Sequence, residues 1–307
     1  MQEGGIIRTI RDVIQGRLTP NLRGQVLIKG GNMQKKTLIL AISVIGILLL
    51  GLVLFVNSKR RLEYTRKTEG PKLQASALFE LARKEDETGE LLKAKSAFMS
   101  FLNNFPNDSR LAEVGQRLSD LNIKILFSPI ISADSKLYEV EPKDSLISIA
   151  KKFNTTAELL RKSNNLASER IKPGMRLKVY TGKFSCVVDK SQNILMLKSN
   201  EEVLKTYTVS TGKNNSTPTG TFKIVSKLTN PVWYKEGSAV PVPPESPENI
   251  LGSRWMGFTL AGYGIHGTTD PATIGQHVTQ GCVRMTNQDV EELYDILPLG
   301  TEVTIID

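Results

Sequence analysis

The feature that most constrains this sequence is an uncharged run of 20 residues from Thr37 to Val56. A helix of that length rises about 30 Å, which is the thickness of the hydrocarbon core of a bilayer. Basic residues flank the run on both sides, and Val56-Asn57-Ser58 is not a small-x-small cleavage site. The run therefore predicts an uncleaved transmembrane helix at 37–56 with an N-terminal tail at 1–36. Met33 is a second candidate start of translation.

The formal net charge of +9 suits an anionic polymer, an anionic lipid surface or nucleic acid as a partner. No zinc-finger spacing, RNA-binding aromatic motif or basic recognition helix is present, so no nucleic acid is expected. The two cysteines, Cys186 and Cys282, do not make a disulfide framework, and with the two histidines they show no usual metal-ligand spacing. We expect no metal and no other cofactor.

Residues 72–126 carry helical periodicity. Apolar residues recur at i, i+3, i+4 and i+7 from Ala75, and a second run ends where Pro106 stops the helix. The second run is similar to one tetratricopeptide-type unit, with matches at Gly89, Ala94, Phe98, Phe101, Leu102 and Pro106. Such units normally need about three repeats for stability. A single unit predicts a helical spacer or, alternatively, a binding site for a protein partner.

Residues 136–180 follow a compact β-α-α-β order, with caps predicted at Asp144-Ser145 and at Thr155-Thr156 for the two helices. The order and spacing resemble a LysM domain, although Lys143 stands where many members carry glycine before the aspartate. The resemblance implies glycan binding; the alternative is a module that only scaffolds its neighbour. The candidate glycan-binding residues are Asp144, Ser145, Leu146, Pro173 and Gly174.

Residues 182–307 contain several short strands separated by turn clusters, which indicates an all-β sheet or sandwich. One helix is predicted between Thr286 and Leu297, with a capping-box-like start at Thr286 and Asp289. Cys186 falls in a predicted strand and is expected in the core.

Cys282 is the strongest candidate for chemistry. Gly281 before it leaves backbone N–H groups unobstructed, and such groups can bind a developing oxyanion. Arg284 lies on the same side of an extended segment, where it can bind a carboxylate and favour the thiolate. His266, in a glycine-rich turn, is the candidate base. From the residues alone, a buried apolar cysteine and a satisfied polar histidine stay open as alternatives.

The spacing of these motifs resembles the signature of the YkuD-type L,D-transpeptidases. His266-Gly267-Thr268 is followed after 16 residues by Cys282, within Gly281-Cys282-Val283-Arg284, and then by Asn287. Further matches are Ser210-Thr211-Gly212, Thr217-Pro218-Thr219-Gly220, Asn230-Pro231-x-Trp233 and Arg254-Trp255-Met256-Gly257. Thr279 and Gln280 replace the common Ser-His pair, so His266 would be the sole base. His277 lies at a variable position and is expected at the surface.

The resemblance implies a multidomain protein whose mainly β catalytic domain, a YkuD-type sandwich with one helix, occupies 182–307. The Cys282 thiolate would attack a stem tetrapeptide, N–H groups near Gly281 would stabilise the oxyanion, and His266 would protonate the departing D-Ala. The product would be a 3→3 crosslink, and carbapenems would acylate the same thiol. The implied substrate-binding residues are Arg284, Thr268, Gly267, Thr279, Gln280, Asn287 and Trp233.

Two alternatives stay open. One is an inert wall-binding scaffold, since Gln280 cannot titrate, and the other is an L,D-carboxypeptidase on the same fold. The charges around 37–56 do not set an orientation. The expected function implies a single-pass protein of the bacterial cell membrane, with a cytoplasmic tail and the catalytic domain facing the periplasm or cell wall. The implied partners are peptidoglycan stem peptides and glycan strands.

Overall fold

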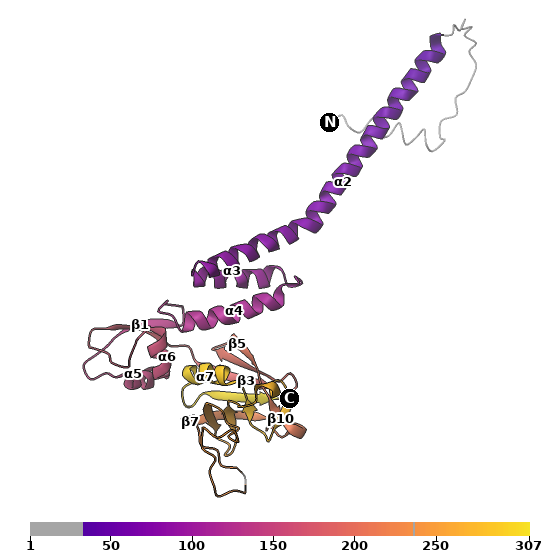
Figure 1. Cartoon of the computed structure of the whole chain (residues 1–307). Coiled ribbons are helices and arrows are strands. Elements are labelled where there is room, and N and C mark those ends of the chain that lie inside the picture. Colours follow the sequence, from indigo (N-terminus) through magenta and orange to yellow (C-terminus); the bar gives the residue numbers. More distant parts are fainter. Residues whose placement is uncertain (1–32, 236) are drawn as a thin grey trace. The chain divides into compact units, whose positions relative to one another are not determined.

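The computed structural model describes residues 33–235 and 237–307, apart from the side chains of 33–50 and 64–68. The chain divides into two compact units, Met1–Gly70 and Pro71–Asp307. Helix α2 is assigned to Met33–Glu87 (Figure 1). It contains Pro71. Within the described residues we find no helix with both the length and the apolarity that crossing a membrane requires. Most of the predicted tail, and the side chains of the predicted anchor up to residue 50, lie outside the described residues.

Three helices form the first module of the second unit: the end of α2, α3 (Leu91–Asn104) and α4 (Leu111–Leu126). Gly89, at φ 80°, turns the chain between α2 and α3. Their facing side chains form one apolar core of Ala75, Phe79, Ala82, Ala94, Phe98, Phe101, Val114, Leu118 and Leu121. The expected helices of this helical module (72–126) are confirmed.

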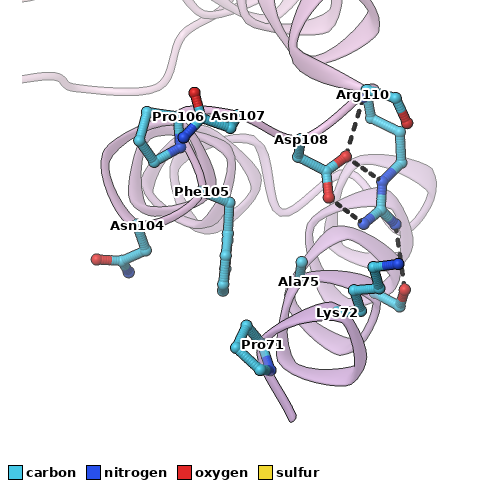
Figure 2. Close-up of a pocket in the computed structure, with 11 residues that line it drawn as sticks. Pro71, Lys72, Ala75, Asn104, Phe105, Pro106, Asn107, Asp108 and Arg110 are labelled. Carbon is cyan, nitrogen blue, oxygen red and sulfur yellow. Dashed lines mark hydrogen bonds and ion pairs between the residues drawn. The ribbon is translucent and has the colours of Figure 1, made fainter. Parts of the chain in front are cut away.

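A groove of about 640 Å³ lies between the start of this module's first helix and the loop from α3 to α4 (Figure 2). Arg110 closes one side, and its guanidinium donates two hydrogen bonds of 2.8 Å to the Asp108 carboxylate. The guanidinium carbon also lies 5.0 Å from the centre of the Phe79 ring. The charge of Arg110 is therefore used inside the loop, and the protein partner of this module stays a prediction.

The LysM-like module (136–180) has the predicted β-α-α-β order. Strands β1 (Ser135–Glu139) and β2 (Arg176–Tyr180) pair antiparallel, and α5 (Leu146–Phe153) and α6 (Ala157–Ser163) lie between them in sequence. Ser145 caps α5 through a capping box with Ser148, and Thr156 caps α6, as the sequence predicts. Lys143 adopts φ 75°, a left-handed conformation that glycine takes more readily than lysine.

The C-terminal domain is mainly β, as expected, and its strands form a mixed sheet of order β11-β9-β8-β7-β12-β3-β4-β5. The strands are β3 (Phe184–Asp189), β4 (Ile194–Ser199), β5 (Glu202–Thr208), β7 (Gly220–Thr229), β8 (Arg254–Phe258), β9 (Gly264–His266), β11 (Val283–Arg284) and β12 (Glu302–Ile306). Strand β7 pairs first with β12 and then with β8, with a register shift between Ile224 and Ser226. Such a partner change lets one sheet turn around a shared core. Buried residues from both ends of the sheet, such as Leu195 and Ile265, meet in that core.

A second, two-stranded parallel sheet joins β6 (Thr211–Gly212) to β10 (His277–Thr279), and short 3₁₀ turns follow β6 (η1, Lys213–Asn215) and precede β10 (η2, Pro271–Thr273). Helix α7 (Asn287–Ile296) is the predicted helix of this domain, and its buried stripe is Val290, Leu293 and Ile296. Thr286 caps it by accepting a 3.1 Å hydrogen bond from the Asp289 N–H.

The three modules of the second unit are joined by specific bonds. The side-chain amide of Asn122 in α4 donates a 3.0 Å hydrogen bond to the carbonyl of Leu204. Leu204 lies on β5, the edge strand of the sheet. Lys178 of the LysM-like module donates 2.7 Å hydrogen bonds to the carbonyls of Ile125 and Ser128 at the end of α4. The Thr156 hydroxyl donates to the Asp295 carbonyl of the C-terminal domain. The helical module therefore covers a sheet edge and is a docked part of the domain.

Candidate active site

A cleft of about 1040 Å³ opens in the C-terminal domain beside the small parallel sheet. Its described lining residues are Lys213, Leu228, Pro231, Val232, Trp233, Tyr234, Ile250, Leu251, Trp255, Gly262, Tyr263, His266, Val278, Thr279, Gln280, Cys282 and Arg284. The fold thus brings together six residues that the sequence predicts for the site: Cys282, His266, Arg284, Thr279, Gln280 and Trp233. They come from segments up to 51 residues apart (284 − 233).

His266 ends β9 and is buried, with 2% of its surface exposed. Its Nδ1 lies 2.7 Å from the Gly267 carbonyl oxygen, which can only accept, so Nδ1 carries the proton and Nε2 keeps a lone pair. The Trp255 ring stacks on the imidazole with centroids 6.1 Å apart. Burial lowers the pKa of His266 to about 4. His266 is therefore a neutral, fixed imidazole at neutral pH, able to accept a proton.

Cys282 directly precedes β11, and its free thiol is partly buried at the cleft. The Sγ lies 3.5 Å from the Gly262 carbonyl oxygen. Burial raises the pKa of the thiol, although the Gly264 N–H and the charge of Arg284 favour the thiolate. The thiol therefore rests protonated and needs a base to become a nucleophile. Cys186 differs: it is buried in β3 and burial raises its pKa to about 12, as expected for a core cysteine.

Gly281 is required by the turn before the nucleophile. Its φ is 139°, and a Cβ atom there would lie 2.6 Å from Cε1 of Tyr263. The Thr279 hydroxyl accepts a 3.1 Å hydrogen bond from the Gly281 N–H and donates 2.7 Å to the Cys282 carbonyl. The Gly281 N–H is therefore already used within the turn. For the Cys282 N–H no partner is recorded in the described chain, which leaves it as the available donor for an oxyanion.

Arg284 presents its guanidinium to the same cleft. Its backbone exchanges two 2.8 Å hydrogen bonds with Ser210, and its Nη1 donates 3.0 Å to the Thr273 hydroxyl. Its Nε is buried and has no hydrogen-bond partner among the described residues. A carboxylate entering the cleft can accept from the unused N–H groups of this guanidinium.

Three predicted substrate contacts, Gly267, Thr268 and Asn287, lie outside the cleft lining. The Asn287 side-chain oxygen accepts 3.1 Å hydrogen bonds from the N–H groups of Ser253 and Thr268. A Cβ atom at Gly267 would lie 2.2 Å from that oxygen. The Thr268 hydroxyl accepts a 3.0 Å hydrogen bond from the Asp270 N–H. These residues hold the chain that follows His266, which positions the imidazole.

Residues 183–305 match the YkuD family model, described as an L,D-transpeptidase catalytic domain, and residues 138–179 match the LysM domain model. YkuD of Bacillus subtilis strain 168, itself named as a candidate L,D-transpeptidase, is 34% identical over 175 residues, which cover 55% of this chain and 97% of the relative. The chain belongs to the YkuD family of L,D-transpeptidases.

A second relative of the YkuD family is YqjB of Bacillus subtilis, also named as a candidate L,D-transpeptidase. It is 39% identical over 127 residues, which cover 39% of this chain and 70% of YqjB. Among solved structures, an L,D-transpeptidase from Mycobacterium smegmatis aligns with 44% of this chain and 64% of its own, at a TM-score of 0.35 and 21% identity.

In this YkuD-family chain, eleven of the described residues that line the cleft are not among the predicted site residues, and Lys213 and Tyr263 are two of them. Each adjoins a quoted motif: Lys213 follows Ser210-Thr211-Gly212, and Tyr263 precedes His266 by three residues. That adjacency was the available signal. His277 is exposed, as predicted, and bonds to Thr211 with its Nδ1 2.8 Å from the hydroxyl.

The predicted glycan-binding residues of the LysM-like module have structural partners. The Asp144 carboxylate accepts a 2.7 Å hydrogen bond from the Tyr138 hydroxyl and a 2.9 Å hydrogen bond from the Glu141 N–H. Leu146 is buried in the module's core, and Gly174, next to Pro173, has φ 85° in the turn before β2. These contacts explain the fold of the module, and glycan contact by these residues stays a prediction.

Proposed function

We propose that this chain is a peptidoglycan L,D-transpeptidase that forms 3→3 crosslinks through a thioester on Cys282. The observation that carries the proposal is a neutral, buried His266 and the Cys282 thiol lining one cleft. Membership of the YkuD family supports the same reaction class.

The first half of the reaction makes the acyl-enzyme. Nε2 of His266 takes the thiol proton, and the Cys282 sulfur attacks the carbonyl carbon of the third residue of a stem tetrapeptide. The Cys282 N–H donates to the oxyanion that forms. The bond to the terminal D-Ala then breaks, and its nitrogen takes the proton back from His266. The products are a thioester and free D-Ala.

The second half transfers the acyl group. An amine of a neighbouring stem attacks the thioester carbon, loses its proton to His266, and expels the Cys282 sulfur, which is reprotonated. If water attacks instead, the chain acts as an L,D-carboxypeptidase. Arg284 would hold a carboxylate of the stem, while Trp233 and Gln280, which line the same cleft, would contact the peptide.

The rest of the chain supports action on a polymer. A match to the LysM model and the basic charge of +9 suit binding to wall glycan strands. Glycan binding would raise the local concentration of stems around Cys282. We further propose, from the uncharged sequence at 37–56, that the chain is held in the bacterial cell membrane with its catalytic domain facing the periplasm or wall.

The test is incubation of the chain with tetrapeptide-stem muropeptides, followed by mass spectrometry. A species with the mass of two stems minus one D-Ala is expected from the wild type and from Cys186→Ala, because Cys186 lies in the core. Cys282→Ala should not form it. Loss of D-Ala without a dimer would establish the carboxypeptidase instead. No reaction, together with retained binding to wall sacculi, would establish the inert scaffold.

A further inference from the structure

The cleft carries two positive charges, and the reaction steps above assign a role only to that of Arg284. Lys213 and Arg284 both line it, and none of the described residues that line it is Asp or Glu. The charge of Asp270 lies close enough to favour the charged form of Arg284. Lys213 differs, because no ion pair and no side-chain hydrogen bond is recorded for its ammonium within the described chain. A solvated ammonium at the rim of a cleft is free to pair with a ligand.

The loop that carries Lys213 is firmly built. Two consecutive residues after it, Asn214 and Asn215, adopt left-handed conformations with φ 50° and 60°. Asparagine adopts this conformation more readily than most other non-glycine residues, so both positions suit the turn. The buried ammonium of Lys190 donates 3.0 Å to the Thr217 carbonyl, and the Thr217 hydroxyl accepts 2.7 Å from the Gly212 N–H. These bonds fix the backbone at Lys213.

The same loop packs against the turn of the nucleophile. A Cβ atom on Gly212 would lie 3.1 Å from the Cα of Gly281, the residue before Cys282. On the other side of the contact, a Cβ atom on Gly281 would lie 3.1 Å from the Ser216 carbonyl oxygen. Lys213 and Cys282, which follow Gly212 and Gly281 in sequence, therefore lie on neighbouring segments that line the same cleft.

We propose that Lys213 is a specificity-determining residue that binds a free carboxylate of the donor stem peptide. The inference rests on the proposed function and names the substrate class: stems with free carboxylates are preferred over stems in which one carboxylate is a carboxamide. A carboxamide has the same shape but no charge, so it loses the attraction to the ammonium. Arg284 would hold a second carboxylate, in line with two cations and no described acid in the lining.

The test measures binding, so that it does not depend on turnover. Cys282→Ala chain is titrated by calorimetry at low salt with a tetrapeptide stem and with analogues in which each carboxylate in turn is a carboxamide. One amidation should weaken binding about five- to tenfold, which corresponds to about 1–1.4 kcal/mol. In the double variant Cys282→Ala/Lys213→Gln, the stem with free carboxylates should bind about as weakly as the amidated analogue binds to Cys282→Ala. Replacing Lys213 with arginine in the Cys282→Ala background should restore the preference for the free carboxylate. Lys223→Gln, an exposed lysine of β7 outside the cleft lining, is the matched control.

The outcomes separate this inference from the proposed function. If Lys213→Gln weakens every stem equally, or weakens none, the assignment of Lys213 is wrong. A preference that survives Lys213→Gln but disappears in Arg284→Gln would also overturn it. If wild-type chain forms no thioester while the charge preference depends on Lys213, the proposed reaction fails and the carboxylate site stands.

Discussion

Replacing Gly281 with alanine should both destabilise the chain and disable the nucleophile. At φ 139° a residue with a Cβ atom is strained, at a cost of about 1–3 kcal/mol. The new Cβ would also lie 2.6 Å from Tyr263 Cε1 and 3.1 Å from the Ser216 carbonyl oxygen, and such overpacking costs about 1–3 kcal/mol more. Urea unfolding should therefore show a loss of about 2–6 kcal/mol. Since relief of the contact moves Cys282, acylation by a carbapenem should slow by about 100-fold or more.

Gly300→Ala is the matched control for this prediction. Gly300 has φ 85°, but nothing lies within 4 Å of a Cβ atom built there. It therefore reports the backbone strain without the contact, and its acylation rate should stay close to that of the wild type. Adding Tyr263→Ala to Gly281→Ala should cost less than the sum of the two single changes. If Gly281→Ala is no more destabilising than Gly300→Ala, the contact with Tyr263 does not restrict this position.

Three other perturbations test the surroundings of the site. Burial lowers the pKa of His266 from 6.5 to about 4. As the pH falls, the His266 imidazole is therefore protonated in the unfolded chain before it is protonated in the folded chain. Between pH 6.5 and 4 the free energy of unfolding of the wild type should fall by about 3 kcal/mol relative to that of His266→Gln. If the difference between the two free energies does not change with pH, His266 is not buried as described. Asn122→Ala leaves the Leu204 carbonyl without its donor and should cost about 1–2 kcal/mol in urea unfolding; an unchanged midpoint would show that the edge contact is not stabilising. Thr286→Ala should cost about 1 kcal/mol by the same assay, while Thr286→Ser, which keeps the capping hydroxyl, should cost little.

Local patterns in the sequence were enough for much of this protein. The helices of 72–126, the β-α-α-β order of 136–180 and the caps at Ser145, Thr156 and Thr286 depend on residues a few positions apart. Cys282 and His266 were found because both motifs are short and their spacing is distinctive. Glycine at 281 could be singled out, since a turn beside a nucleophile limits the residue type.

Only the tertiary structure decided how these pieces serve the site. The order of the sheet, the docking of α4 on the β5 edge and the placement of Lys213 beside Gly281 all depend on contacts between residues far apart in sequence. Among those contacts, the Asn287 side-chain oxygen accepts a hydrogen bond from the Thr268 N–H in the chain after His266, and substrate contact by these two residues stays a prediction. They also showed that the Gly281 N–H donates to the Thr279 hydroxyl, while no partner is recorded for the Cys282 N–H in the described chain. A motif specifies which groups are present, whereas hydrogen bonds made across the fold determine which of those groups remain free to meet a substrate.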